Sequence, residues 1–236
     1  MPVIQDQVLY YVNRSNQRGG RMLSVIDLLL AGTFDKLLLC RVMERIANGS
    51  SWMVGAQAGG AGKTTVMSAL LAMLPAGERV ALAAQDEPWR TASPGTCVVA
   101  YEISPGAYDG YIWDEALRAY VALGRQGCRL VTNLHADTLE EARGQIVIEN
   151  RVPPDQFDAL GMFIPVVVER TSAGLTRLVR EVYCIRNGGG ELLSPEAPLS
   201  PRARAMDGFL EACLRDGLRT VESVRRAWLE FLNKSD

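Results

Sequence analysis

The run QAGGAGKTT, residues 57–65, constrains the fold of this chain more than any other feature. It follows a short apolar segment, residues 52–54, and precedes residues 66–74, whose apolar side chains recur at helical spacing. A glycine-rich loop between a strand and a helix can wrap its backbone N–H groups around phosphate oxygens, and the helix N-terminus adds partial positive charge. The sequence therefore predicts a phosphate-binding loop in its proper strand–loop–helix context.

Within this loop, Lys63 is expected to reach the terminal phosphates and the Thr64 hydroxyl to bind Mg²⁺. The full set expected to contact a nucleotide is Gly59, Gly60, Ala61, Gly62, Lys63, Thr64 and Thr65. One departure concerns the first position of the pattern G-x-x-x-x-G-K-T, where this chain has Gln57 in place of glycine. Neighbouring glycines can supply the missing flexibility, and a glycine-rich turn without a ligand is the alternative interpretation.

Composition excludes several other classes of protein. A chain of 236 residues that is 48% hydrophobic can bury one sizeable core. A net charge of −2 argues against a protein that coats nucleic acid. We see no apolar run of membrane-spanning length and no signal-peptide layout. The five cysteines are scattered and the chain has one histidine, which argues against a disulfide framework or a zinc site and for buried thiols in a reducing cytoplasm.

Strands and helices alternate up to about residue 150. Near-continuous apolar runs at residues 80–84, 96–101 and 129–133 are typical of parallel strands covered on both faces by helices. Three side chains are expected to cap helices: Ser24, Asp35, and Thr138 in a capping box with Glu141. These patterns predict an α/β fold with a mostly parallel sheet.

The pattern changes after residue 150. Two β-rich runs, residues 162–169 and 175–185, flank a turn and predict a hairpin. A glycine- and proline-rich stretch, residues 187–201, predicts a linker, and two amphipathic helices follow it. We therefore expect a main domain over residues 1–190, and a linker with a C-terminal helical pair over residues 191–236.

Chemistry-bearing side chains follow three further strands. Glu102 ends an apolar strand, as in a Walker B motif, and Asp86 and Glu87 follow the strand before it. His135, in the run TNLHADT, follows the next strand. Ligands of open parallel sheets bind at the carboxyl ends of the strands, so these groups are expected to converge with the phosphate loop.

The order of these motifs resembles that of the type II and type IV secretion ATPases, which drive pilus extension, pilus retraction and protein secretion. That family has a Walker A loop, an aspartate box of Glu-Asp-Pro type, a Walker B of Gly-Glu-Ile type and a histidine box T-x-H-A-[ND]-[ST]. This chain has Asp86-Glu87-Pro88, Tyr101-Glu102-Ile103 and His135-Ala-Asp-Thr138 in those places. The resemblance covers about residues 24–185 and implies a RecA-like P-loop ATPase domain.

The chain also departs from the family. No part of these 236 residues resembles the family's large N-terminal domain, which supplies arginines, and we expect this domain to be missing. The Arg-Asp that follows the family's Walker B is Ser104-Pro105 here. The aspartate box aligns in two ways, with Gln85 replacing a glutamate or with the two acids exchanged. Since an arginine can accelerate NTP hydrolysis by roughly 10³-fold or more, we expect a homo-oligomer or a protein partner to supply one. Candidate donors within a second copy are Arg90, Arg118 and Arg143.

The resemblance implies ATP and Mg²⁺ as cofactors and a role for each acid. Glu102 is expected to prepare the attacking water, with Glu87 or Asp86 assisting through the water shell of the metal and His135 sensing the γ-phosphate. The leading function is a cytoplasmic Mg²⁺-dependent ATPase. Such a protein can also associate peripherally with a secretion or pilus complex at the inner membrane. A nucleotide-binding switch with little hydrolysis is the alternative, and a small-molecule phosphotransferase is the third.

Overall fold

The computed structural model describes residues 6–16, 19–172, 174–194 and 197–235 of the chain. An eight-stranded sheet forms its centre, in the order β10-β9-β6-β1-β5-β3-β2, with β4 beside β3. The strands are β1 (Trp52–Gly55), β2 (Arg79–Leu82), β3 (Thr96–Ile103), β4 (Tyr111–Ile112), β5 (Arg129–Leu134), β6 (Met162–Pro165), β9 (Tyr183–Arg186) and β10 (Gly189–Leu192).

The central part of this sheet is parallel. Strands β6, β1, β5, β3 and β2 run in the same direction, and β9 and β10 extend one edge as antiparallel strands. The strand that follows the phosphate loop in sequence, β2, lies at the far edge, so β5 and β3 separate it from β1. This is the RecA-like arrangement, and the α/β fold expected from the sequence is confirmed.

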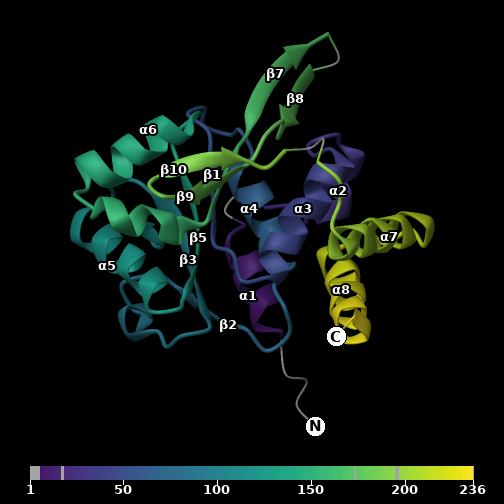
Figure 1. Cartoon of the computed structure of the whole chain (residues 1–236), viewed down its shortest axis with the longest axis horizontal. Coiled ribbons are helices and arrows are strands. Elements are labelled where there is room, and N and C mark those ends of the chain that lie inside the picture. Colours follow the sequence, from purple (N-terminus) through teal and green to yellow (C-terminus); the bar gives the residue numbers. More distant parts are fainter. Residues whose placement is uncertain (1–5, 17–18, 173, 195–196, 236) are drawn as a thin grey trace.

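Helices cover both faces of the sheet (Figure 1). On one face lie α1 (Gln7–Arg14), α2 (Val25–Leu30), α3 (Lys36–Ala47) and α4 (Lys63–Leu71). Two further helices, α7 (Pro201–Arg215) and α8 (Val221–Ser235), pack against these helices on the same side. The other face packs against α5 (Asp114–Arg125), α6 (Leu139–Arg143) and the short helical segments Gly144–Glu149 and Pro154–Leu160. Successive strand residues point to opposite faces. Within β3, Cys97 and Val99 therefore join one core, and Val98 and Ala100 join the other.

The three expected helix caps are present. Ser24 and Thr138 each accept a hydrogen bond within a capping box, with Asp27 and Glu141 respectively, and Asp35 accepts from the first turn of α3. The helix that Thr138 caps is α-helical only as far as Arg143 and continues as a π-helix over Gly144–Glu149. Such π-helical turns are frequent near functional sites, and this one is separated from the histidine box by α6 alone.

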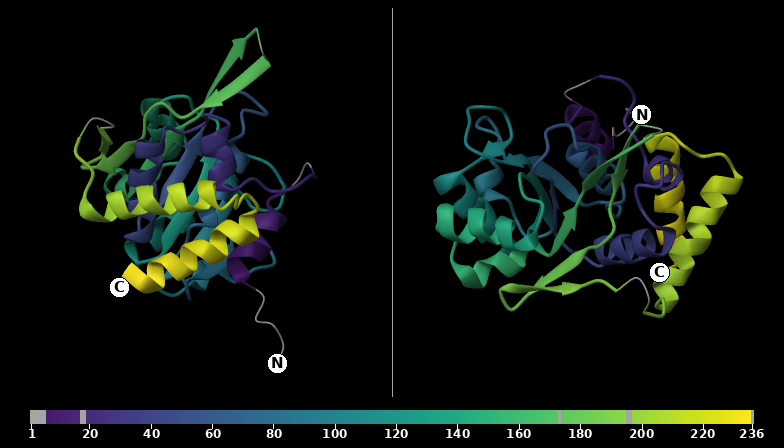
Figure 2. Two further views of the ribbon diagram at one scale, coloured as in Figure 1. Left: turned by 90° about the vertical axis from the view of Figure 1, so that its right-hand side faces the viewer. Right: turned by 90° about the horizontal axis from the view of Figure 1, so that it is seen from above.

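The expected hairpin is present as a separate two-stranded sheet of β7 (Val167–Thr171) and β8 (Gly174–Leu178). It stands out from the body of the molecule (Figures 1 and 2). The linker predicted from residue 187 is wrong at its start, because β9 and β10 form a second hairpin there. Asn187 and Gly188 connect them with φ of 53° and 73°, the conformation in which an Asn-Gly pair closes a two-residue hairpin.

The C-terminal helices pack on the same face as the phosphate-loop helix (Figure 2). Arg225 on α8 donates hydrogen bonds to the carbonyls of Ala72 (2.8 Å) and Leu74 (2.9 Å), and Trp228 Nε1 donates to Met73 at 2.7 Å. These carbonyls follow the end of α4, where no partner exists within the helix. The tail therefore supplies the C-terminal cap of α4.

Candidate functional site

A cavity of about 570 Å³ lies at the carboxyl ends of β1 and β3. The phosphate loop forms one wall, and the segment before α2 together with α2 forms another. The lining residues are Ser15, Asn16, Met22, Leu23, Leu28, Ala31, Thr33, Gly59, Gly60, Ala61, Gly62, Lys63, Thr64, Thr65, Val66, Glu102, Tyr111, His135, Leu175, Thr176 and Arg177. The cavity thus includes every loop residue expected to contact a nucleotide.

The backbone of the loop explains its sequence. Gly60 and Gly62 have φ of 78° and 95°, which side-chain-bearing residues rarely adopt. Gln57 is not among the non-glycine residues with positive φ, so this position does not need glycine. The Gln57 N–H donates to Asp137 Oδ1 at 2.8 Å, which ties the entry of the loop to the histidine box. The departure at Gln57 is therefore compatible with the strand–loop–helix geometry.

Lys63 begins α4 and is 7% exposed. Its Nζ donates to the Ala56 carbonyl at 3.0 Å and lies 3.8 Å from Oε1 of Glu102, an ion-pair distance too long for a hydrogen bond. Burial lowers the pKa of Lys63, and the nearby carboxylate opposes that shift. The lysine is therefore held at the loop by one hydrogen bond to backbone and by a longer ion-pair contact with Glu102.

Glu102 lies near the end of β3 and is also 7% exposed. The pairing of β3 with β5 is irregular between Ala100 and Ile103, where a bulge changes the direction of the side chains. Oε1 lies 3.9 Å from His135 Nε2. Burial raises the pKa of Glu102, against the lowering effect of Lys63. A buried carboxylate beside a phosphate loop can orient a water molecule and accept its proton.

Asn133, which sequence reasoning did not single out, lies between the loop and β3. Its Nδ2 donates to the Tyr101 carbonyl at 2.9 Å and lies 3.4 Å from the Thr64 hydroxyl. The sequence could have indicated Asn133, because this residue lies at the carboxyl end of β5, two residues before His135. Its side chain is fully buried, and its position fits a residue that orients Thr64.

The donor set fits a hydrated magnesium ion. Oε1 of Glu102 and Oδ1 of Asn133 are buried acceptors without a hydrogen-bond partner, beside the Thr64 hydroxyl. Among the described residues, no group of three or more His, Cys, Asp or Glu side chains could hold a metal by itself. Mg²⁺ is usually held by one or two protein oxygens, substrate phosphates and several waters. Two acceptors without a hydrogen-bond partner and one hydroxyl match that pattern of coordination.

His135 lies against the loop from the side of β5. Its Nδ1 is 3.1 Å from the Gln57 carbonyl and 3.3 Å from Lys63 Nζ, so its tautomer decides whether it donates to the first or accepts from the second. The Gln145 side chain, from the π-helical turn, donates to the His135 carbonyl. The imidazole is 43% exposed and lines the cavity. A phosphate bound in the loop would therefore alter the contacts of His135 with Gln57 and Lys63.

Asp86 and Glu87 are not among the residues that line the cavity. Asp86 is exposed. Glu87 accepts hydrogen bonds from Arg14 (2.5 Å), the Tyr11 hydroxyl (3.1 Å) and the Leu82 N–H (3.0 Å). Burial, with Glu87 adding to it, raises the pKa of Tyr11 to about 12. The structure thus places Glu87 in a junction between α1 and β2, and the expected roles of both acids stay predictions.

The three candidate donor arginines make contacts elsewhere. Arg90 lies over the Trp89 ring, Arg118 donates to the Asn150 carbonyl at 2.8 Å, and Arg143 donates to the Gly188 carbonyl at 3.1 Å. None of the three lines the cavity of its own chain. Arg177, from the β7–β8 hairpin, does line it. Sequence reasoning missed Arg177 because no local pattern shows where a hairpin will fold.

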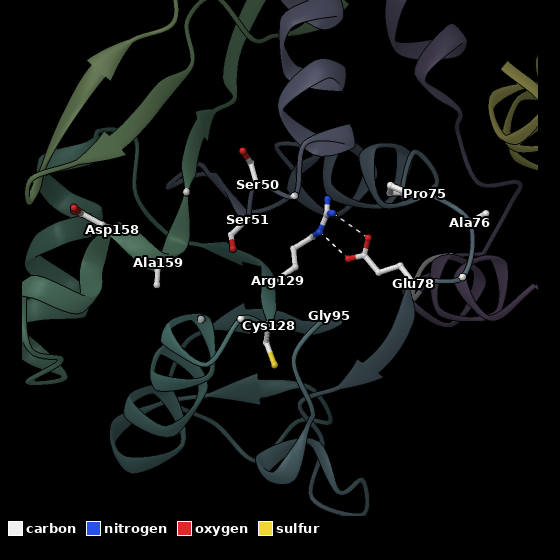
Figure 3. Close-up of a pocket in the computed structure, with 15 residues that line it drawn as sticks. Ser50, Ser51, Pro75, Ala76, Glu78, Gly95, Cys128, Arg129, Asp158 and Ala159 are labelled. Atoms are coloured by element: carbon white, nitrogen blue, oxygen red, sulfur yellow. Dashed lines mark hydrogen bonds and ion pairs between the residues drawn. The ribbon is translucent and has the colours of Figure 1, made fainter. Parts of the chain in front are cut away.

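A second cavity, of about 630 Å³, lies at the opposite, amino ends of the strands (Figure 3). Arg129 and Glu78 form its most prominent pair, with Nε 2.7 Å from Oε1 and Nη2 donating to Oε2 at 2.9 Å. Nη1 of Arg129 donates to the Ile46 carbonyl at 2.7 Å. Arg129 and Glu78 pair with each other, and Arg129 also bonds a backbone carbonyl. These two charged side chains therefore lack the unpartnered acceptors found in the cavity beside the phosphate loop.

No family model matches the chain, and no curated protein matches it. Solved structures of similar fold include two ATPases. The Legionella pneumophila ATPase DotB shares 13% identity at a TM-score of 0.46, over 75% of this chain and 54% of DotB. The Brucella suis VirB11 ATPase of a type IV secretion system, solved with sulphate, shares 15% identity at a TM-score of 0.41, over 80% and 68%. The chain thus spans about half the length of DotB.

All five cysteines are buried free thiols, as expected. Within the part of the chain that the structure describes, no helix has the length and apolar character needed to cross a membrane.

Proposed function

We propose that this chain binds ATP with Mg²⁺ and hydrolyses it, as a relative of the secretion ATPases. The observation that carries the proposal is the approach of the buried Glu102 carboxylate to within 3.8 Å of the phosphate-loop lysine, Lys63. A phosphate loop alone would hold a nucleotide. A buried carboxylate at the same place adds the group that hydrolysis requires.

Each side chain has a role that follows from its position. The loop N–H groups and Lys63 bind the phosphates, and Lys63 offsets the charge that develops on them. Glu102 orients the attacking water and accepts its proton, which its raised pKa favours. His135, with Nε2 3.9 Å from Glu102 and Nδ1 3.3 Å from Lys63, responds to the γ-phosphate.

The Thr64 hydroxyl and the Asn133 amide would hold the metal and its waters. When bound, Mg²⁺ would stabilise the negative charge of the phosphates. Asn133 keeps Thr64 oriented through its Nδ2 and offers Oδ1 to a water. Asp86, which is exposed and does not line the cavity, stays a candidate for assisting through the water shell of the metal.

Glu102→Gln tests the proposal. It keeps the size of the side chain and removes the charge, so ATP affinity should survive while single-turnover hydrolysis falls by about 10²–10⁴-fold. Both quantities should be measured on the same preparations of wild type and variant. A variant that hydrolyses ATP as fast as an active wild type would exclude Glu102 as the base. Loss of binding together with hydrolysis would assign Glu102 to the fold or the metal.

The second candidate function is a nucleotide-dependent switch with little hydrolysis. Ser104 and Pro105, in place of the Arg-Asp of the resembled family, favour it. A wild type that binds ATP without turnover, and a Glu102→Gln variant indistinguishable from it, would support the switch.

We also propose that the chain works as a homo-oligomer or with a protein partner, at a secretion or pilus complex of the inner membrane. If a second molecule contributes to catalysis, turnover per molecule should rise with protein concentration. Constant turnover across a wide dilution series, with a monomer by light scattering, would contradict this.

A further inference from the structure

Both ends of the β7–β8 hairpin are fastened to backbone that borders the phosphate loop. Val166, just before β7, donates to the carbonyl of Gly55 at 2.8 Å, and Gly55 ends β1, which leads into the loop. Val179, just after β8, donates to the carbonyl of Thr33 at 2.7 Å, and Thr33 lines the cavity. The base of the hairpin is therefore hydrogen-bonded both to the strand that leads into the loop and to a residue that lines the cavity.

Beyond these attachments the hairpin has little support. In the described part of the chain, its two strands pair only with each other. The hairpin extends away from the helices and the main sheet (Figures 1 and 2). An isolated two-stranded hairpin is marginally stable in water. Its position is thus easily changed by a small number of contacts with the loop.

Arg177 makes such a contact. Its Nη2 donates to the Gly60 carbonyl at 3.3 Å, and a Cβ added to Gly62 would lie 2.9 Å from its Cδ. The side chain therefore lies directly on the phosphate loop, and it lines the cavity together with Leu175 and Thr176. Glycine at position 62 leaves room for the arginine as well as allowing the positive φ.

The acceptor that Arg177 uses is a weak one for a guanidinium. A backbone carbonyl is neutral, whereas phosphate oxygens carry negative charge and match two parallel N–H groups of the guanidinium fork. Arg177 is exposed, so its side chain can move from the carbonyl to a phosphate without breaking a buried contact. A phosphate bound in the loop would be the stronger partner.

We propose that Arg177 binds the phosphates of the nucleotide from within the same chain, and that the hairpin is thereby ordered against the loop when the nucleotide binds. The inference rests on the proposed nucleotide binding. It supplies in cis an arginine that the sequence led us to expect from a second molecule. Arg177 acts here by binding and positioning the phosphates, and its contact makes the hairpin respond to the occupancy of the site.

The test compares three variants of the full chain with wild type. Arg177→Gln removes the guanidinium, Arg177→Lys keeps a charge without the fork, and Arg180→Gln removes a charge three residues away, where Arg180 pairs with Glu169 at 2.5 Å. Affinity for fluorescent analogues of Mg·ATP and Mg·ADP is titrated. Hydrogen exchange of the β7 and β8 amides is measured with and without Mg·ATP.

We expect Arg177→Gln to weaken Mg·ATP binding about tenfold or more, Arg177→Lys to weaken it less, and Arg180→Gln to change it by less than about twofold. Mg·ATP should slow exchange in the hairpin of wild type and of Arg180→Gln, but not of Arg177→Gln. Unchanged affinity and protection in Arg177→Gln, or equal losses in Arg177→Gln and Arg180→Gln, would overturn the inference while nucleotide binding stood. A wild type that binds neither nucleotide would overturn the proposed function and the inference together.

Discussion

The ammonium group of Lys63 lies 3.8 Å from the carboxylate of Glu102, and the two side chains are only 8% and 9% exposed. Burial favours the neutral form of each group, so it lowers the pKa of Lys63 and raises the pKa of Glu102. The attraction between the two charges opposes both shifts. A buried pair at this distance is weakly satisfied. It is suited to exchange its contact for phosphate and water.

Lys63→Ala should weaken Mg·ATP binding by about tenfold to a hundredfold, because it removes a charge-assisted contact worth roughly 1.5–3 kcal/mol. Lys234→Ala, on the exposed end of α8, is the matched control and should bind as wild type does. Titration with a fluorescent ATP analogue measures both, after thermal unfolding has shown that each variant folds. An unchanged affinity in Lys63→Ala would mean that the loop is not the binding site.

Glu87→Gln should lower stability, and it should lower hydrolysis far less than Glu102→Gln does. It weakens the hydrogen bonds of Glu87 with Arg14 and Tyr11, and since Arg14 is 31% exposed we expect a loss of only about 1–2 kcal/mol. Glu115→Gln, at an 85% exposed side chain, is the control. Urea unfolding and single-turnover hydrolysis are measured on all three proteins. A fall in hydrolysis as large as that of Glu102→Gln, with stability unchanged, would transfer the catalytic role to Glu87.

Much of this fold could be predicted from the sequence because its signals are local. The phosphate loop, the caps at Ser24 and Asp35 and the apolar strands each depend on neighbouring residues. The β9–β10 hairpin also had its signal in Asn187-Gly188, but the following glycines and prolines outweighed it, and the stretch was interpreted as a linker.

The site was predictable only in part, for the same reason. Residues at strand ends, such as Glu102, could be assigned because the carboxyl ends of parallel strands converge. The contacts of Glu87 with α1 and of Arg177 with the loop join segments 73 and 117 residues apart, respectively. No periodicity or spacing encodes such contacts, since they depend on how the helix and the hairpin pack.

The buried carboxylate of Glu102 should make stability depend on pH. Burial raises its pKa above the ordinary value of 4.5, so the folded chain binds this proton more tightly than the unfolded chain does. Below about pH 4.5 the group is protonated in both states and carries no charge penalty. As pH rises through the raised pKa, the folded state must bury the charge, and Glu102 lowers the free energy of unfolding.

This dependence can be isolated by comparing Glu102→Gln with wild type. The variant lacks the titrating group, so the free energy of unfolding of the variant minus that of wild type should grow as pH rises from about 4.5 toward neutrality. Urea unfolding at a series of pH values gives this difference, and titrations common to both proteins cancel. A difference that is constant, or that shrinks with rising pH, would contradict the shift.

The last prediction concerns the C-terminal helical pair, which the sequence predicted after a linker within residues 191–236. Arg225 is 3% exposed, donates to the carbonyls of Ala72 and Leu74 beyond the end of α4, and also bonds Asp6. Arg225→Ala leaves these carbonyls without donors, so the free energy of unfolding should fall by about 2–4 kcal/mol.

Arg226→Ala is the control, because Arg226 is the exposed neighbour on the same helix and its loss should change stability by less than about 0.5 kcal/mol. Urea unfolding is followed with a fluorescent ATP analogue bound in the loop, which reports on α4, and by far-UV circular dichroism, which reports on the whole chain. If the tail caps α4, both signals should shift to lower urea together in Arg225→Ala. A shift in circular dichroism with no shift in the loop signal would mean that the tail unfolds by itself and that α4 does not depend on it.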